Sequence, residues 1–152
     1  MPTILKSLLY RMIPNLYAYF LSFAFTTVLI VYTLNVPTLV TGEKELVKTY
    51  YLTNYKSNII LDIFLIAIYL SIAEVGIRYW KLSDIWKKLA TVAIVTCCIS
   101  SAFYMYFIST PKTSHFFSRW FHAVGFNAVI YDMILVTGTY YTYDCLLKKF
   151  TS

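Results

Sequence analysis

The feature that most constrains this chain is a long uncharged interval near its N-terminus. No Asp, Glu, Lys or Arg lies between Arg11 and Glu43, and Pro14 and Pro37 bracket the strongly apolar part. A helix of about 20 apolar residues crosses the roughly 30 Å of hydrocarbon in a bilayer. We therefore predict a first membrane span over residues 16–36. It is too long for a cleavable signal peptide, whose apolar region has about 7–15 residues.

Three further apolar runs follow, at residues 59–77, 89–108 and 124–143. Each has the length of a spanning helix, and Thr110-Pro111 ends the third. The runs are continuous and lack the alternation of barrel strands, so helices are the spanning structure that satisfies the backbone in lipid. We predict an all-α integral membrane protein, a four-transmembrane-helix bundle, with residues 1–152 as a single membrane domain.

The composition supports a lipid bilayer as the surrounding solvent. Apolar residues make up 59% of the chain and charged residues 13%, whereas soluble domains have about 45–50% and about 25%. A water-soluble chain of this size would leave too much apolar surface exposed. The 13 Lys and Arg residues are spread over the loops, without the clustered face that nucleic-acid binding requires. No nucleic-acid partner is expected.

The basic residues also predict the topology. The N-terminus, the second loop and the C-terminus together hold eight Lys and Arg residues, and the first and third loops hold five. The positive-inside rule then places both termini on the cytoplasmic side. Aromatic residues gather at the predicted span ends, as expected of an interfacial belt. The polar loop over residues 37–58 is long enough for a short surface helix.

Two acidic residues near the ends of the second span have structural interpretations. Glu74 and Arg78 are four residues apart, the spacing at which helical side chains meet, so we predict an ion pair. Asp62 falls in the first turn of the predicted helix. There a carboxylate complements the helix dipole and reaches water or lipid headgroups.

Asp132 is different because it lies near the middle of the fourth predicted span. No basic residue sits three or four positions away, so its partner must come from another helix or from water. Gly125 and Ala128 share a helical stripe with Asp132, and Asn127 adds a polar group nearby. Small residues allow close helix approach, which favours a hydrogen bond from Asp132 to a neighbouring helix. The alternative is a proton or cation site.

Motifs that would indicate catalysis are incomplete. Tyr131-Asp132 matches half of an intramembrane aspartyl protease, but the second aspartate in a Gly-x-Gly-Asp setting is missing. His115 and His122 have no Gly-x-Ser-x-Gly sequence beside them, and the three cysteines have neither a C-x-x-C motif nor metal-ligand spacing. We expect no enzymatic activity, no cofactor and no metal site.

Arg119, Trp120 and His122 form the most concentrated polar-aromatic patch. Arg and Trp are favoured anchors at protein interfaces, which suits contact with a partner. An interfacial helix entry with a snorkelling Arg at the headgroups is the favoured alternative.

One segment resembles a known class of proteins. Its shared positions are Phe117, Trp120, Phe121, Gly125, residues 128–132, Leu135 and Val136. This pattern is similar to a segment of small multi-span membrane proteins of large icosahedral double-stranded DNA viruses, of the chlorovirus kind. The resemblance lies in the C-terminal third of the chain. It implies a non-enzymatic minor capsid or membrane component of the virion, in the inner membrane beneath the capsid shell.

The leading functional hypothesis is a structural membrane protein that anchors or scaffolds a larger assembly. Its expected partners are the lipid bilayer and other membrane or capsid proteins. Two alternatives stay open: an accessory subunit of a cellular membrane complex, and a small proton or ion channel or transporter that uses Asp132.

Overall fold

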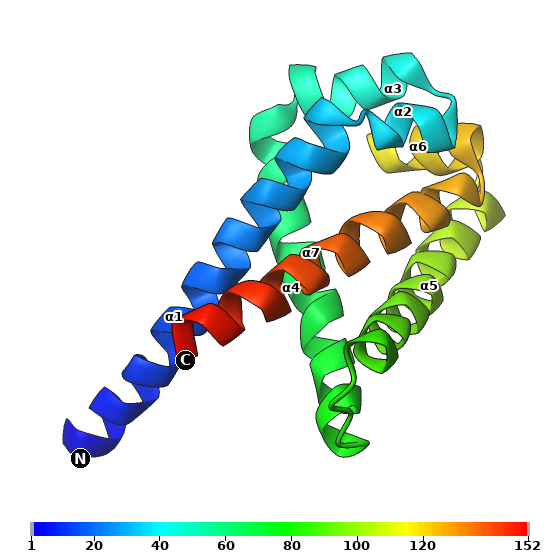
Figure 1. Cartoon of the computed structure of the whole chain (residues 1–152). Helices are drawn as coiled ribbons and strands as arrows, with labels where there is room; N and C mark the ends of the chain where they lie inside the picture. Colours follow the sequence, from blue (N-terminus) through cyan, green and yellow to red (C-terminus); the bar gives the residue numbers. More distant parts are fainter. Residues whose placement is uncertain (1, 152) are drawn as a thin grey trace.

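The computed structural model describes residues 2–151, and the side chains of residues 13–150. Four long helices dominate it (Figure 1), and no strand occurs among the described residues, which confirms the all-α prediction. They are α1 (Pro2–Thr27), continued by the π-helical turn η1 (Val28–Thr33), α4 (Tyr55–Tyr79), α5 (Ile85–Ser109) and α7 (Asn127–Thr151).

Three helices are long and apolar enough to cross a bilayer: Ile13–Thr33, Tyr55–Tyr79 and Ile85–Ser109. They coincide closely with the first three predicted spans. Pro14 does not begin the first helix, as its bracketing position suggested, because it lies inside α1. The helix continues through it, since membrane helices tolerate the missing backbone N–H of an internal proline.

The fourth predicted span, residues 124–143, is wrong at its start. The short helix α6 (Phe116–Val124) meets α7 at 106°, and the two are long and apolar enough to span a bilayer only when they are taken together. Gly125 lies at the bend with φ of 62°, a conformation that glycine adopts without the steric penalty of a Cβ. Apolar residues flank the bend on both sides, so hydropathy alone does not reveal it.

α7 is the central helix of the bundle. It crosses the molecule between α1 and α5 (Figure 1) and packs most extensively against these two. Its side chains that face them are buried, including Ala128, Leu135, Val136, Thr139 and Tyr140. Because neighbouring helices shield it from the surroundings, α7 can carry more polar residues than the outer helices.

Gly138 sets the distance between α7 and the first helix. A Cβ atom built at this position would lie 3.1 Å from Cδ1 of Ile30 and 3.3 Å from Cγ2 of Thr26. At contacts this short, the side chains of Ile30 and Thr26 would have to shift by a few tenths of an ångström to admit even a methyl group. The close approach of these two helices therefore depends on a residue without a side chain.

A cap of short helices covers one end of the bundle. It comprises α2 (Val36–Thr41), α3 (Lys44–Lys48), the π-helical turn η2 (Thr49–Thr53) and α6. The polar loop over residues 37–58, which is long enough for a short surface helix, therefore holds most of α2, all of α3 and η2, and the start of α4. The start of α1, the α4–α5 turn and the end of α7 lie at the opposite end of the molecule (Figure 1).

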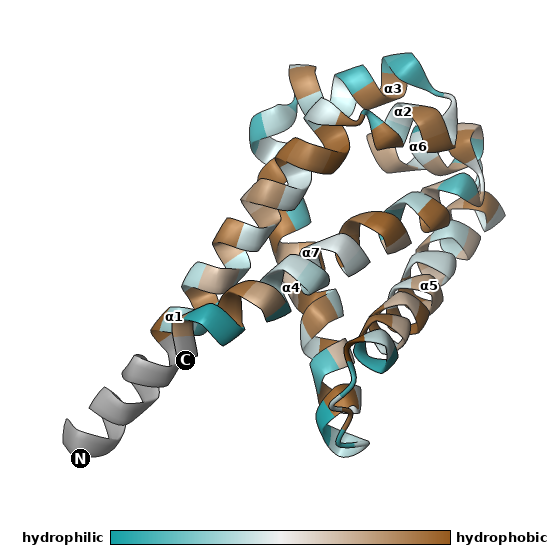
Figure 2. Ribbon diagram, in the orientation of Figure 1, coloured by the Kyte–Doolittle hydropathy of each residue, from teal (hydrophilic) through white to brown (hydrophobic). Residues whose placement is uncertain are grey.

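The outer faces of the long helices are apolar. Figure 2 shows hydrophobic residues along α1, α4 and α5, with hydrophilic residues concentrated at the α4–α5 turn and in the cap. Large side chains such as Phe64, Val75 and Ile94 are more than 60% exposed on these faces. Apolar surface of this extent is typical of helices in contact with lipid.

Candidate functional site

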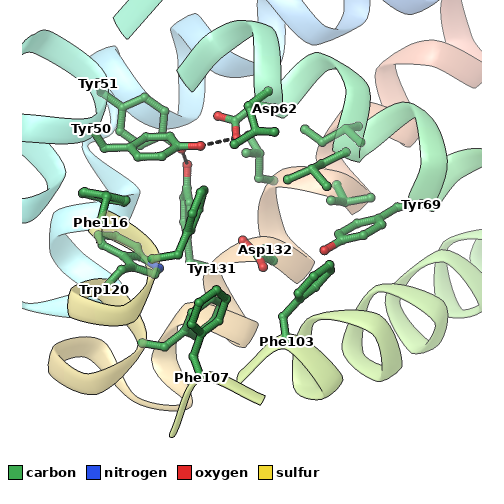
Figure 3. Close-up of a pocket in the computed structure, with 17 residues that line it drawn as sticks. Tyr50, Tyr51, Asp62, Tyr69, Phe103, Phe107, Phe116, Trp120, Tyr131 and Asp132 are labelled. Atoms are coloured by element: carbon green, nitrogen blue, oxygen red, sulfur yellow. Dashed lines mark hydrogen bonds between the residues drawn. The ribbon is translucent and has the colours of Figure 1, made fainter. Parts of the chain in front are cut away.

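A cavity of about 240 Å³ lies between α4, α5 and α7, beneath η2 and α6 (Figure 3). Asp62 of α4 and Asp132 of α7 both line it, and its remaining walls are aromatic or aliphatic. Aromatic side chains come from every neighbouring element: Tyr50, Tyr51, Tyr69, Phe103, Phe107, Phe116, Phe117, Trp120, Phe121 and Tyr131. The cavity thus combines two acidic groups with an apolar, aromatic enclosure.

Asp132 connects α7 to α5 and α4. Ser100 Oγ, on α5, donates a hydrogen bond to Asp132 Oδ2 at 2.7 Å, and the hydroxyl of Tyr69 on α4 lies 3.3 Å from Ser100 Oγ. A serine hydroxyl has a single proton, so Tyr69 is the donor to Ser100 when Ser100 donates to Asp132. Three helices are thereby joined by one chain of hydrogen bonds inside the bundle.

Asp62 lies deeper in its helix than expected. Because α4 begins at Tyr55, Asp62 is about two turns inside it, and the prediction of a first-turn position is wrong. The side chain is half-buried and accepts a hydrogen bond at 2.6 Å from the hydroxyl of Tyr50 in η2. The carboxylate therefore faces the inside of the bundle and ties the cap to α4.

A second pair of hydroxyls closes the cavity on the cap side. The hydroxyls of Tyr51 in η2 and Tyr131 in α7 are hydrogen-bonded to each other. Burial, together with the neighbouring Asp62 carboxylate, raises the pKa of Tyr50 above its ordinary value. Burial likewise raises the pKa of Tyr51. Both phenols consequently stay protonated and available as hydrogen-bond donors.

Aromatic stacking between η2 and α6 holds the roof of the cavity together. The ring of Tyr50 lies 5.0 Å from that of Phe116 and 6.4 Å from that of Trp120, measured between centroids. Phe116 and Trp120 are themselves stacked at 5.9 Å. Ring pairs at these distances add stabilisation beyond that of the buried area. The roof is therefore an ordered part of the bundle.

The structure separates the residues expected to accompany Asp132. Asn127 is the first residue of α7 and is exposed. Gly125 lies at the bend, outside α7, and so cannot share a stripe with Asp132 on that helix. The residue that does share the cavity is Asp62, which sequence reasoning assigned to the interface.

The polar-aromatic patch is also divided. Trp120 is buried, with 8% of its surface exposed, so the expectation that it contacts a partner or headgroups is wrong. The ring of Trp120 occupies the inner face of α6, whereas Arg119 is exposed on the outside. His122 is half-buried, and its Nδ1 lies 2.8 Å from the Ser118 carbonyl oxygen. Only Arg119 is left as a freely exposed member of the patch.

Glu74 and Arg78 form the expected ion pair, with 3.1 Å between Arg78 Nε and Glu74 Oε2. The other carboxylate oxygen of Glu74 accepts a hydrogen bond from the hydroxyl of Tyr140 on α7 at 3.0 Å. The pair therefore also connects α4 to the central helix.

Sequence reasoning missed a second ionic connection, at the end opposite the cap. Asp144 of α7 accepts from Lys88 of α5 at 3.1 Å and pairs with Lys148 one turn further along α7. The Asp144 and Lys88 side chains are only 11% and 18% exposed. The four-residue spacing of Asp144 and Lys148 was the available signal, but nothing in the sequence indicates Lys88 as a partner.

The arrangement of two acidic groups in an aromatic enclosure suits noncovalent binding. Among the side chains of residues 13–150, no three His, Cys, Asp or Glu groups converge as metal ligands would. A second pocket lies along Asn15, Glu74, Arg78 and Tyr143, and it shares no lining residue with the cavity.

Comparisons with known proteins found no match, so the functional argument rests on the geometry described above. No protein-family model matches the chain, and neither a curated protein nor a solved structure matches it.

Proposed function

We propose that the chain is a non-enzymatic, four-span membrane protein that anchors or scaffolds a larger assembly. In this proposal α7, entered through the bend from α6, is the fourth crossing. The observation that carries it is the use of polar side chains inside the bundle, where they join helices to each other.

Each long helix of the α4–α5–α7 group takes part in such contacts. Asp132 accepts from Ser100, and Glu74 accepts from Tyr140. A polar contact between helices in lipid stabilises association, because the alternative is an unsatisfied polar group in hydrocarbon. A rigid bundle of this kind suits a structural role.

The cap supplies the surface that a partner would contact. Its outer face carries the exposed charges Lys44, Glu45, Lys48 and Arg119, which lie outside the apolar spans. Charged side chains on an interface rim favour encounter with a partner of complementary charge. The resemblance of residues 117–136 to viral membrane proteins supports a narrower version, in which the assembly is the inner membrane and capsid of a large double-stranded DNA virus.

The excess of Lys and Arg at the end opposite the cap supports a cytoplasmic position for both termini. This orientation is part of the proposal. A cysteine introduced at Glu45, reacted with a membrane-impermeant thiol reagent in intact cells, tests it in a background with the three native cysteines replaced. Labelling from outside intact cells is expected, and labelling only after permeabilisation would contradict it.

Chemical crosslinking in the native membrane tests the anchoring role. We expect the full-length chain to crosslink to a defined partner in fixed stoichiometry through the cap, and Arg119→Glu to reduce the yield. Thr151→Glu, at the far end of α7, is the matched control and should leave the yield unchanged. A chain that diffuses as a monomer without a stable partner would exclude this function.

The channel or transporter alternative is separated by a flux measurement. It predicts pH-dependent cation or proton flux through liposomes that contain the purified protein, and loss of that flux in Asp132→Asn. The structural proposal predicts no flux above that of protein-free liposomes, with or without the substitution.

A further inference from the structure

The cavity holds two carboxylates that the protein itself does not neutralise. Asp62 and Asp132 line it from α4 and α7, and no Lys, Arg or His is among the lining residues. One oxygen of each accepts a hydrogen bond, from the hydroxyl of Tyr50 and from that of Ser100. Among the described residues, the other oxygen of each carboxylate has no hydrogen-bond partner. Acidic groups inside a bundle are costly unless they are paired with opposite charge.

The walls favour an organic cation over a metal ion. Tyr50, Phe107, Phe116 and Trp120 line the cavity, and aromatic faces attract ammonium groups at short range. A volume of about 240 Å³ is far larger than the roughly 10–15 Å³ that one water needs. Metal ions such as Ca²⁺ require six to eight oxygen ligands at about 2.3–2.6 Å, and this aromatic enclosure does not supply such a shell.

The wall between α4 and α5 indicates that the ligand comes from the bilayer. Leu61 and Leu65 of α4 are half-buried there, and Phe103 of α5 is 42% exposed. These side chains line the cavity and also reach the apolar outer surface. A molecule with an apolar body would thus pass between two lipid-facing helices without crossing the charged cap.

We propose that this cavity is a binding site for a small amphiphile that carries a protonated or quaternary amine on an apolar body. The nitrogen lies between the carboxylates of Asp62 and Asp132, against the aromatic rings. The apolar body extends along Leu61, Leu65 and Phe103 towards the lipid. This binding is independent of the anchoring role and does not require it.

Binding to the purified full-length chain in maltoside micelles tests the proposal. Three probes share one apolar body and differ in head group: phenylbutylamine, phenylbutanol and phenylbutyrate. We expect the amine to bind about tenfold to a hundredfold more tightly than the alcohol, because charge-assisted hydrogen bonds to two carboxylates are lost in the alcohol. Phenylbutyrate should not bind. Equal affinity for the amine and the alcohol would overturn the proposal.

Variants localise the site. Asp62→Asn and Asp132→Asn should each weaken binding of the amine by about tenfold and leave the affinity for the alcohol unchanged. Glu74→Gln, which removes an acid of α4 outside the cavity, is the matched control and should change neither. Leu65→Trp fills the cavity and leaves both acids in place, so it should weaken binding of the amine and of the alcohol alike. This variant tests the location even if the Asn variants fold poorly. Unchanged amine binding in folded Leu65→Trp would refute the location.

Two competition arms define the occupant. Sodium or calcium ions that stabilise the protein and displace the amine at equal concentration would show a metal site and overturn the proposal. Phosphatidylcholine carries a quaternary ammonium in its headgroup. If it displaces the amine at low mole fraction, the lipid headgroup is the source of the ammonium group; if it does not, the source is a free amine.

Discussion

The hydrogen bond between Ser100 and Asp132 gives the sharpest test of how the bundle is held together. The two residues belong to α5 and α7, and their oxygens lie 2.7 Å apart. Ser100 is fully buried, so its hydroxyl has no contact with bulk water and depends on partners inside the bundle. Ser100→Ala and Asp132→Leu should each lower the free energy of unfolding, and the double variant should lower it by less than their sum.

The size of the coupling follows from the setting. Hydrogen bonds between membrane helices contribute about 0.6 kcal/mol on average and up to about 1.7 kcal/mol. The acceptor here is a carboxylate, and bonds to charged groups lie at the upper end of the range. We therefore expect a coupling free energy of about 1–1.7 kcal/mol. Asp132→Asn, which keeps a neutral acceptor oxygen in place, should retain a smaller coupling, near the average of about 0.6 kcal/mol.

Equilibrium unfolding in mixed micelles, with the fraction of denaturing detergent varied, measures the four free energies of the cycle. Ser101→Ala is the matched control, because Ser101 neighbours Ser100 on α5 and its hydroxyl lies 4.0 Å from Cys97 Sγ on the same helix. Its coupling to Asp132→Leu should stay within about 0.5 kcal/mol, the usual limit for independent sites. A Ser100 coupling no larger than that of Ser101 would refute the interhelical role of Asp132.

Three further predictions concern packing and charge. Gly138→Leu should destabilise the bundle by about 3 kcal/mol, because overpacking forces α1 and α7 apart. Gly138→Ala should cost far less. Equal thermal stability of Gly138→Leu and the wild type would contradict the close approach of the two helices. Lys88→Asp should lower the melting temperature. The charge exchange, Lys88→Asp with Asp144→Lys, should restore part of the loss, since the pair is largely shielded from solvent. Failure of the exchange to restore any stability would argue against a direct ion pair. Trp120→Ala should lower the free energy of unfolding by about 3 kcal/mol as a core truncation. Arg119→Ala should change it by less than about 0.5 kcal/mol. The reverse ranking in thermal unfolding would mean that α6 presents its other face to the bundle.

The extent of the long helices followed from the sequence because it depends on consecutive residues. The extent of a helix can be read directly from a run of apolar residues such as residues 89–108, and Thr110-Pro111 marks its end. The pairing of Glu74 with Arg78 likewise depends only on helical spacing. The requirement that Asp132 find a partner on another helix or in water was also predictable, because no basic residue lies one turn away.

What the sequence could not show is which residues far apart in the chain meet. The partner of Asp132 is 32 residues away, and that of Asp144 on α5 is 56 residues away. Hydropathy is nearly unchanged across Gly125, so the 106° bend that starts α7 left no mark in the apolar pattern. The sequence signals were single polar residues in apolar surroundings, such as Ser100. A residue of this kind does not show which distant residue it bonds to.

The sequence by itself determined that this protein is helical, apolar and built of helices long and apolar enough to span a membrane, because each of these properties belongs to a local stretch of chain. Only the tertiary structure decided that α7 is the central helix and that Asp62 and Asp132 share one cavity. It also decided that Trp120 points inward. The physical reason is that side chains on different helices meet only where packing brings their faces together. That packing depends on small residues, bends and caps acting across the whole bundle.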